Sequence, residues 1–418
     1  MTFIKRYFSM YTHLPKEIYV LAFGRIMTSM GALIWPMLTL IMSNKLDLNG
    51  QTIGLYMMIF SMFMVPCNLL GGKLADKYNK KRIIVIFDLI GNSLYFICAM
   101  LPISMYTLYF MAIASVFQQM EQPSYDALIA DLTNYKDRQR AYSFNYLAMN
   151  LGLVLAPTIG GILFNNYLNL AFLINGLADL SSTLLILFFI KNVRAITNGD
   201  NHLNEYEKGE SGSLFQVLIE RKLLFILFMI TGISSLIYSQ YQFLMPLHLE
   251  DVFQDTGAFK FGILTSINAF IVVIGTPVLT KKCRRIIDIK IMYLGQFFES
   301  FGLMFFIFLN RYFIIAIIGM VLFTIGEILL AISNTPYLTK RIPETHRGRI
   351  LAIISIFSGL VGTCSNYVIG ILIDNYSFHF VWEVIACISL VLFVIYKIYL
   401  RLDKQTYPSL YIDFSNEK

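Results

Sequence analysis

The chain has 418 residues, of which 57% are hydrophobic and only 14% are charged. Soluble globular domains carry about a quarter charged residues, so this composition excludes an ordinary soluble fold. The net charge of +7 raises the question of a nucleic-acid partner, which the distribution of the basic residues answers below.

Twelve apolar runs divide the chain, and each is close to the length of about 20 residues that crosses a bilayer. They cover residues 18–43, 50–71, 83–101, 105–129, 141–163, 168–190, 222–246, 260–280, 287–309, 313–335, 350–373 and 378–400. Only helices satisfy their own backbone in lipid at this hydrophobicity, so the sequence predicts an all-α membrane protein with 12 transmembrane helices. The start of the chain lacks the features of a cleaved signal peptide, so we expect the first span to be retained.

The basic residues follow the topology that these spans impose. With the N-terminus inside, most of the 33 Lys and Arg residues lie in or beside the termini and every second connection, whereas Lys45, Lys260 and Arg311 lie on the opposite side. This positive-inside pattern predicts that both termini are cytoplasmic. It accounts for the net charge without a nucleic-acid partner.

Cysteine and histidine offer no metal or redox site in the sequence. The five cysteines form neither a CxxC motif nor a disulfide framework, and the five histidines are dispersed along the chain. We therefore predict no cofactor and no metal.

A polar segment divides the spans into two groups of six. The predicted organisation is an N-terminal six-helix half at 1–190, a cytoplasmic linker at 191–221, a C-terminal six-helix half at 222–401 and a cytoplasmic tail at 402–418.

The two halves contain a repeated pattern. "RQRAYS" at 138–143 and "GGILFNNY" at 160–167 recur 209 residues later as "RGRILA" at 347–352 and "IGILIDNY" at 369–376. Internal repeats of this kind are typical of transporters whose substrate site lies between two pseudo-symmetric halves.

A charged stretch, "GGKLADKYNKKRII" at 71–84, lies between spans two and three. It resembles the signature Gly-x-x-x-Asp-Arg-x-Gly-Arg-Arg of the major facilitator superfamily. The matching residues are Gly72, Asp76, Lys77, Lys80 and Lys81, with lysine for arginine three times. Asn79 replaces the second glycine, and asparagine tolerates the positive φ that a tight turn needs.

The resemblance implies the major facilitator fold and a role for this stretch as a conformational latch. Asp76 would hold the outward-facing arrangement against the start of span eleven, together with nearby basic residues, of which we include Arg140. The alternative is that Asp76 is a solvated turn residue. The counterpart of the stretch at 275–288 has Leu279 where the aspartate would align, so a latch of this kind is expected in the first half only.

A second resemblance lies in the fifth span, "GLVLAPTIGG" at 152–161. It is similar to the antiporter motif of the same family, which is associated with drug/proton exchange. The matching residues are Gly152, Pro157, Gly160 and Gly161. The alternative explanation is tight packing of the span through its small residues.

Ionisable residues within the spans are candidates for function because each is costly in lipid. Arg25 in span one and Glu121 in span four lie at similar depths, about 10 and about 13 Å from the cytoplasmic face, and are predicted to form an ion pair. Glu121 shares a helical stripe with Gln118, Gln122 and Tyr125, and we expect these residues and Arg25 to bind substrate. The alternative is an ion pair that only anchors two helices.

Four acidic residues are predicted to couple transport to protons. Glu327 in span ten is the leading candidate, because burial favours the neutral form of a carboxyl group and lets it exchange a proton. Glu121, Asp179 in span six and Glu299 in span nine complete the set, with hydrogen bonding inside the bundle as the alternative. Asp88, near the start of span three, is assigned to the cytoplasmic charge network instead.

Span seven adds a polar and aromatic stripe. Tyr238, Tyr241 and Gln242 are predicted substrate-binding residues, since aromatic rings with a polar atom suit amphiphilic ligands.

The sequence therefore predicts a secondary active transporter that resembles the proton-coupled multidrug efflux (drug:H⁺ antiporter) branch of the family. It would export amphiphilic or cationic compounds by alternating access, as a monomer in a bacterial plasma membrane, with a small-molecule substrate, protons and the lipid bilayer as its partners. The alternative is a dedicated proton-coupled carrier of one metabolite, peptide or sugar, with Arg25 binding an anionic group. No nucleophile–base pair or phosphate-binding glycine loop indicates an enzyme, and no long soluble segment indicates a sensor.

Overall fold

The structure is a computed structural model, and it describes residues 11–133, 135–190, 221–309, 312–342 and 347–411. Within these residues, nine helical stretches are long and apolar enough to cross a membrane. One of them, Lys222–Cys283, contains two helices, and two further helices with acidic residues in their interiors fall outside the nine. Each of the twelve predicted spans is helical over most of its length, so the predicted all-α membrane fold is confirmed.

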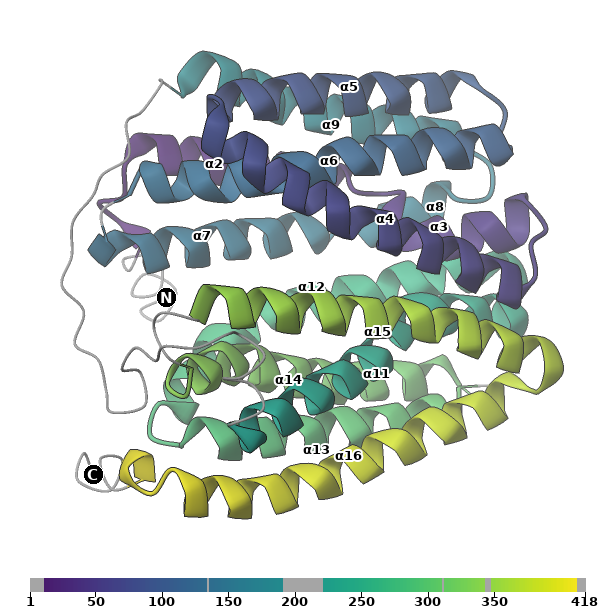
Figure 1. Cartoon of the computed structure of the whole chain (residues 1–418). Coiled ribbons are helices and arrows are strands. Elements are labelled where there is room, and N and C mark those ends of the chain that lie inside the picture. The colour runs from purple at the N-terminus through teal and green to yellow at the C-terminus, as the bar shows by residue number, and fades with distance from the viewer. Residues whose placement is uncertain (1–10, 134, 191–220, 310–311, 343–346, 412–418) are drawn as a thin grey trace, which may run out of the picture. The chain divides into compact units, whose positions relative to one another are not determined.

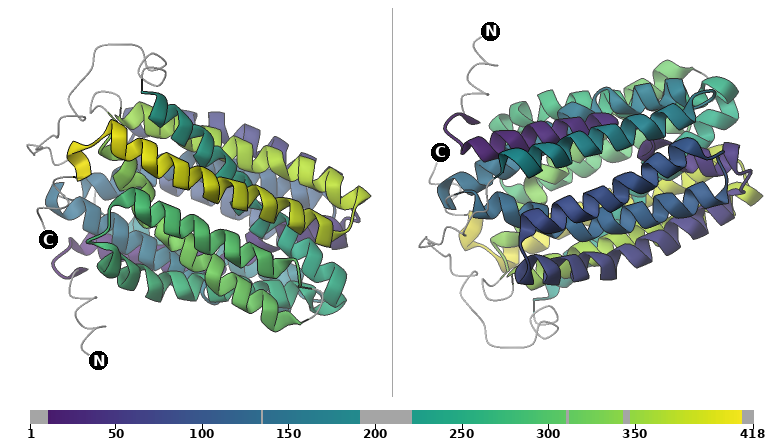
Figure 2. Two further views of the ribbon diagram at one scale, coloured as in Figure 1. Left: turned by 90° about the horizontal axis from the view of Figure 1, so that it is seen from below. Right: turned by 90° about the horizontal axis from the view of Figure 1, so that it is seen from above.

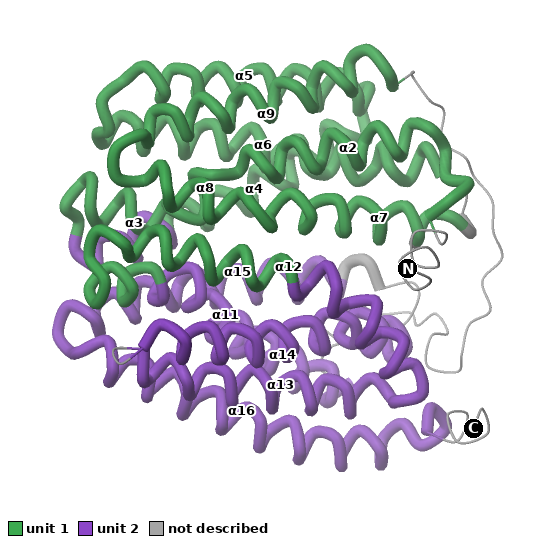
Figure 3. Tube along the Cα trace, turned by 180° about the vertical axis from the view of Figure 1, so that it is seen from behind, with its two compact units in different colours: residues 1–48, 59–200, 246–270 green, residues 49–58, 201–245, 271–418 purple. Residues whose placement is uncertain are grey.

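The chain forms two compact units, coloured separately in Figure 3. Unit 1 comprises residues 1–48, 59–200 and 246–270, and unit 2 comprises residues 49–58, 201–245 and 271–418. Three helices contribute residues to both units: α4 (Gly50–Lys77), α11 (Lys222–Phe253) and α12 (Gly257–Cys283). Most of the predicted linker, residues 191–220, lies outside the described residues.

Unit 1 is organised around α9 (Leu168–Phe189). This helix packs on α2 (Lys16–Gly31) and on α5 (Lys80–Met100), while α2 also packs on α7 (Tyr135–Leu153) and α5 on α6 (Met105–Asp131) (Figure 1). Each of the five helices supplies buried apolar residues to one core, among them Leu21, Ile84, Ile129, Ala141 and Ile186. A polar side chain on the inner face of α9 therefore meets both α2 and α5.

Unit 2 is organised around α13 (Asp288–Phe306), which packs between α14 (Phe313–Thr339) and α16 (Phe378–Thr406). Figure 2 shows α16, in yellow, running beside the green helices of the same unit. α15 (Arg347–Asn375), which also lies wholly in unit 2, contacts α16.

Each unit has a salt bridge between the start of one helix and the end of the next helix. The basic and acidic residues have exchanged places between the two units. In unit 1, Lys80 at the start of α5 lies 2.8 Å from Asp131 at the end of α6. In unit 2, Asp288 at the start of α13 lies 2.7 Å from Lys340 at the end of α14. The sequence separations between equivalent residues, 208 and 209, agree with the repeat of 209 residues found in the sequence. The pairs α5–α6 and α13–α14 are thus counterparts.

Two predicted spans are interrupted at prolines. The first is broken after α2, where Ala32 leaves the helical region (ψ 58°) and Pro36 lies in a 3₁₀ turn, Trp35–Met37, ahead of the short α3 (Leu38–Leu40). The fifth ends as α7 at Leu153 and restarts as α8 (Ala156–Leu163) with Pro157 in its first turn. Proline lacks an N–H donor and fixes φ, so it is favoured at helix starts, as Pro157 is here.

The last helix extends into the predicted tail. We expected the C-terminal half to end at 401, but α16 continues to Thr406 because Asp403 is fully buried and anchors the end of the chain. Its carboxylate accepts a bidentate pair of bonds from Arg341, at 2.9 and 2.8 Å. The Tyr337 and Tyr411 hydroxyls donate to the same carboxylate, at 2.5 and 2.7 Å.

Candidate functional site: a carboxyl cluster in unit 1

Asp179 lies on the inner face of α9, where α2, α5 and α6 come closest to it. It is 4% exposed, and its Oδ2 accepts bonds from Asn175 (2.9 Å) and Gln118 (3.5 Å). Its other carboxyl oxygen, Oδ1, is buried and has no hydrogen-bond partner among the described residues. An unsatisfied buried carboxyl oxygen is costly, so this position calls for a proton, a cation or water.

Asp88 faces Glu121 across the α5–α6 contact. Their two carboxyl groups share a side-chain hydrogen bond, and the Thr183 hydroxyl donates to Asp88 Oδ2 at 2.9 Å. Asp179 lies close enough to interact electrostatically with both carboxyl groups. The assignment of Asp88 to a cytoplasmic charge network is therefore wrong: eight residues beyond Lys80, its side chain points into the bundle.

Arg25 is the cation of this cluster, and it interacts electrostatically with Asp88, Glu121 and Asp179. The predicted ion pair with Glu121 is absent among the described residues. Arg25 instead donates to Gln122 Oε1 at 3.3 Å and lies over the Tyr125 ring, 5.1 Å from its centroid. The sequence placed the two residues at the right depth but could not determine which neighbour the guanidinium would contact.

The residues of the predicted stripe on α6 make two kinds of contact. Gln118 and Gln122 belong to the cluster, where Gln118 donates to Asp179 and Gln122 accepts from Arg25. Tyr125 is 4% exposed, and its hydroxyl donates to the Leu21 carbonyl at 2.9 Å. In this structure Tyr125 therefore joins α6 to α2.

Unit 2 holds a second set of predicted residues on α11, α13 and α14. The Tyr238 hydroxyl donates to Glu327 Oε1 at 3.0 Å, and the rings of Tyr238 and Tyr241 each lie 5.9 Å from the Phe323 ring. Gln242, which was predicted with this stripe, is exposed.

Glu299 on α13 is 2% exposed and interacts electrostatically with Glu327. Its Oε2 and the Oε1 of the neighbouring Gln296 are buried without a hydrogen-bond partner in the described part of the chain. The Gln296 amide donates to Ser389 Oγ on α16 at 3.1 Å, so Gln296 is fixed from the opposite side.

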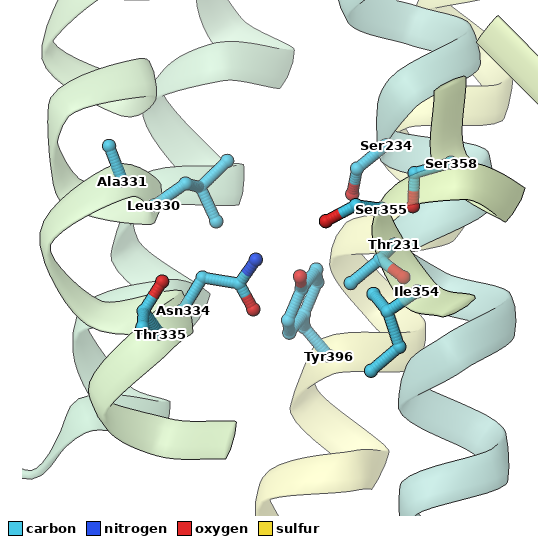
Figure 4. Close-up of a pocket in the computed structure, with 10 residues that line it drawn as sticks. All are labelled: Thr231, Ser234, Leu330, Ala331, Asn334, Thr335, Ile354, Ser355, Ser358 and Tyr396. Carbon is cyan, nitrogen blue, oxygen red and sulfur yellow. The ribbon is translucent and has the colours of Figure 1, made fainter. Parts of the chain in front are cut away.

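A pocket of about 340 Å³ opens within unit 2 among α11, α14, α15 and α16 (Figure 4). Its polar lining carries no formal charge and consists of Thr231, Ser234, Asn334, Thr335, Ser355, Ser358 and Tyr396. No sequence motif marks this pocket, because its hydroxyl groups are spread over four helices.

The latch residues lie at two helix ends. Gly72, Asp76 and Lys77 belong to the last turns of α4, and only two residues separate this helix from α5. Asn79 does not adopt the positive φ that we expected: its φ is −66°, and it caps α5 by accepting from the Arg82 N–H at 3.1 Å. Asparagine is a preferred residue at this position, which explains the choice of side chain.

Two of the basic latch residues, Lys81 and Arg140, form hydrogen bonds to other residues of unit 1. Lys81 donates to the carbonyls of Leu187 and Ile190 at the end of α9, at 2.7 and 2.6 Å. Arg140 pairs with Asp137 at 2.8 Å and donates to the Thr12 carbonyl at 2.8 Å. The predicted partner of Asp76 at 347–349 cannot be compared, since those side chains lie outside the described residues.

The antiporter-like motif allows close helix contacts. A Cβ at Gly152 would lie 2.7 Å from the Ile26 carbonyl oxygen of α2, and one at Gly160 would lie 2.6 Å from that of Leu33. A Cβ at Gly161 would lie 2.6 Å from the Ala258 carbonyl oxygen at the start of α12. The packing explanation therefore accounts for these glycines, and an exchange role for the motif stays a prediction.

No group of three or more His, Cys, Asp or Glu side chains within the described ranges is arranged to hold a metal ion.

Known proteins similar to this chain are bacterial transporters. The chain is 25% identical to a Na(+), Li(+), K(+)/H(+) antiporter of Planococcus maritimus over 333 residues, 72% of this chain and 77% of the relative. It is 24% identical to Multidrug resistance protein 1 of Bacillus subtilis over 360 residues (85% and 89%). It is also 30% identical to Quinolone resistance protein NorA of Staphylococcus aureus over 151 residues (35% and 38%).

Solved structures share the fold at low sequence identity. One is a POT family transporter in complex with a thioalcohol conjugated peptide, with a TM-score of 0.77 and 14% identity over 93% of this chain and 96% of that one.

The family model described as Major Facilitator Superfamily matches residues 20–365 and, in a second match, residues 289–410. The protein is accordingly a transporter of small molecules and not an enzyme, and its relatives indicate a multi-pass protein of the bacterial plasma membrane. The chain belongs to the major facilitator superfamily.

Proposed function

We propose that this transporter is a proton-coupled antiporter that exports amphiphilic or cationic compounds by alternating access. The observation that carries the proposal is the cluster of Asp88, Glu121 and Asp179 around the single guanidinium of Arg25. Three carboxyl groups outnumber one cation, so the site attracts positive charge. The names of the relatives, which include antiporters and drug-resistance proteins, support the same class of substrate.

The cluster provides a physical basis for exchange. Carboxyl groups that share a buried site cannot all ionise, so protons and a positively charged substrate compete for the same negative charge. A proton bound at Asp88 and Glu121 would release a cation, and its departure would allow the next cation to bind. Rocking of the two six-helix halves around such a site would carry the two species in opposite directions.

The test measures proton release from membrane vesicles. Everted vesicles with an acidified interior should lose protons when tetraphenylphosphonium is added outside, which a pH-sensitive dye reports. Glu121→Gln should abolish the signal while the protein is still present in the membrane. Glu383→Gln, an exposed carboxyl of α16, is the matched control and should behave as wild type. An unchanged signal in Glu121→Gln would refute the role of the cluster.

A second candidate is exchange of a small alkali cation for protons. The oxygen atoms of Asp88, Glu121 and Thr183 converge at one place, and the relative from Planococcus maritimus carries the name of a Na(+), Li(+), K(+)/H(+) antiporter. Adding NaCl or LiCl to the same vesicles in place of tetraphenylphosphonium distinguishes the two candidates, because only this function predicts proton release with the inorganic ions.

A carrier that binds an anionic group at Arg25 is less well supported. The guanidinium already contacts Gln122 and Tyr125 and interacts with four carboxyl groups, Asp126 among them, so an anion would be repelled there. The likeness to peptide transporters of the POT family concerns the fold alone. Cytoplasmic termini, a monomeric state and a latch role for Asp76 belong to the same proposal.

A further inference from the structure

A pair of carboxyl groups occurs in unit 2 on the counterparts of the helices that carry the pair in unit 1. Glu299 lies on α13 and Glu327 on α14, and the two interact electrostatically. In unit 1, Asp88 on α5 and Glu121 on α6 form the corresponding pair. Both pairs can be placed by their distance from the salt bridge that joins the ends of their helices.

The carboxyl pair of unit 2 lies farther from its salt bridge than the pair of unit 1, and the difference is the same on each of the two helices. Asp88 lies eight residues from Lys80 and Glu121 ten residues from Asp131, about 12 and 15 Å along the helices. For unit 2 the separations are 11 residues from Asp288 to Glu299 and 13 from Glu327 to Lys340, about 17 and 20 Å. The second pair is therefore displaced by three residues, close to one helical turn, and its two members still interact electrostatically.

Close helix packing brings the second pair together. Gly295 and Gly302 of α13 lie against Gly326 and Gly319 of α14, and a Cβ at Gly302 would approach the Gly319 carbonyl oxygen to 2.7 Å. Gly326 directly precedes Glu327 and lies against the backbone of Glu299. The glycines thus keep two acidic side chains in proximity at a buried position, where a purely structural contact would favour apolar residues.

The surroundings of Glu299 favour a ligand that is small and positive. Its Oε2 and the Gln296 Oε1 are buried without partners among the described residues, and no described cation forms an ion pair with Glu299. The titratable groups that interact with it come from both helices packed on α13, namely Glu327 on α14 and Tyr396 on α16. A proton shared by the two carboxyl groups would satisfy this site without an additional cavity.

Tyr396 links the pocket of unit 2 to this pair, because it lines the pocket and interacts electrostatically with Glu299. Asn334 lies five residues from the end of α14, about 8 Å, and Tyr396 lies ten residues from the end of α16, about 15 Å. Figure 4 shows the Asn334 side chain directed toward Tyr396 inside the pocket. Buried oxygen atoms of Asn334 and Ser358 have no partner in the described chain, so water can satisfy them.

We propose that Glu299 and Glu327 form a second proton-binding site, loaded through the pocket of unit 2 by way of Tyr396, so that two protons are exchanged per substrate. The Tyr396 hydroxyl oxygen accepts a proton from a hydronium ion in the pocket, which becomes water, while its own hydroxyl proton passes to the Glu299 carboxylate. The tyrosine is left unchanged. This inference rests on the proposed proton-coupled antiport and specifies its stoichiometry.

The experiment measures the gradient that a pH difference can sustain. In proteoliposomes with the membrane potential held at zero, each exchanged proton multiplies the limiting gradient of tetraphenylphosphonium by about 10 per pH unit. Wild type should sustain a gradient of about 100-fold at a difference of one pH unit, and Glu299→Gln about 10-fold. Glu327→Gln should give the same loss and serves as the second variant if Glu299→Gln fails to fold. Glu383→Gln should keep the wild-type gradient.

The outcomes separate the two proposals. If wild type sustains no gradient, the proposed antiport is wrong. If wild type sustains one and neither Glu299→Gln nor Glu327→Gln reduces it, antiport stands and the second site is refuted. Tyr396→Phe should slow equilibration severalfold without changing the final gradient, whereas Tyr293→Phe, which stacks on Phe393, should leave the rate unchanged. Equal rates in the two variants would refute the route through Tyr396.

Discussion

Asp88 occupies the point where α5, α6 and α9 meet, and its carboxyl group contacts Glu121 and Thr183. The depth of Asp88 in the membrane could be predicted from the sequence, but its contact partners could not. Helical periodicity gives the face on which a residue lies and not the neighbouring helix that packs on that face. Since the pair Asp88–Glu121 acts as a unit in the proposed exchange, loss of either member should have a similar effect.

We therefore expect Asp88→Asn to abolish proton-driven transport as completely as Glu121→Gln. The carboxamide keeps the size of the side chain and its bond from Thr183 but cannot exchange a proton at neutral pH. Uptake of tetraphenylphosphonium into proteoliposomes under a pH gradient measures the effect. Asp251→Asn, at an exposed position of the same unit, is the control. Normal transport by Asp88→Asn would return Asp88 to a structural role.

Asp76 is an exposed carboxylate in the last turns of α4, where the helix dipole disfavours negative charge. Asp76→Asn should therefore raise the thermal stability of the purified protein slightly, by about 0.3–1 kcal/mol, since the dipole cost is removed. If Asp76 is a latch, the same variant should nevertheless transport more slowly. An equally active variant would identify Asp76 as a solvated residue at a helix end.

Asp403 provides a test of stability rather than of transport. Arg341 and Asp403 are 1% and 0% exposed, so Asp403→Asn would leave the guanidinium buried without its counter-charge. Breaking such a pair costs about 3–5 kcal/mol, and we expect a large fall in the thermal unfolding temperature in detergent. Asp251→Asn should leave that temperature unchanged. A small effect for Asp403→Asn would mean that water reaches Arg341.

The end of the chain depends on the same carboxylate. Burial and the hydrogen bond to Asp403 raise the pKa of Tyr411, so this tyrosine stays protonated and acts as a donor throughout the physiological pH range. The sequence signal for this anchor was a single aspartate in an apolar helix, which we took as the start of a tail. Only the tertiary contact with Arg341, 62 residues away, distinguishes the two interpretations.

At the scale of helices, glycine contacts decide how closely α13 and α14 approach. Gly326→Ala would place a methyl group 2.6 Å from the Gly295 carbonyl oxygen, which should destabilise the protein by about 1–3 kcal/mol. Gly359→Ala in α15 meets nothing within 4 Å and should stabilise the helix by about 0.5–1 kcal/mol. The thermal unfolding temperatures of the two variants compare the same substitution at a tightly packed position and at an open position of unit 2. Similar shifts in both would show that α13 and α14 can separate at no cost.

The helices themselves could largely be predicted from the sequence, because hydrophobic length sets the span and polar residues mark its ends. Their interruptions were less visible: Pro36 and Pro157 break two spans, whereas Pro123 and Pro336 lie inside continuous helices. A proline alone does not determine whether a helix stops or bends, since neighbouring packing decides the outcome. The contacts between helices required the structure.

For the molecule as a whole, the repeat of 209 residues in the sequence agrees with the two equivalent helix pairs. It did not reveal that the salt bridges at their ends have opposite polarity, Lys80–Asp131 and Asp288–Lys340. Either polarity joins the same helix ends, because an ion pair needs opposite charges and not a particular order. The carboxyl pairs deeper in both units lie on equivalent helix pairs, so the proposed proton exchange would use the same helix arrangement in each unit.

The central claim is that proton movement drives substrate in the opposite direction. Proteoliposomes with an acidic interior, held at zero membrane potential, should accumulate tetraphenylphosphonium against its gradient and lose it when nigericin collapses the pH difference. Vesicles with Glu121→Gln should behave like protein-free vesicles. Accumulation that persists without a pH gradient, or that requires an alkaline interior instead, would contradict proton-coupled antiport.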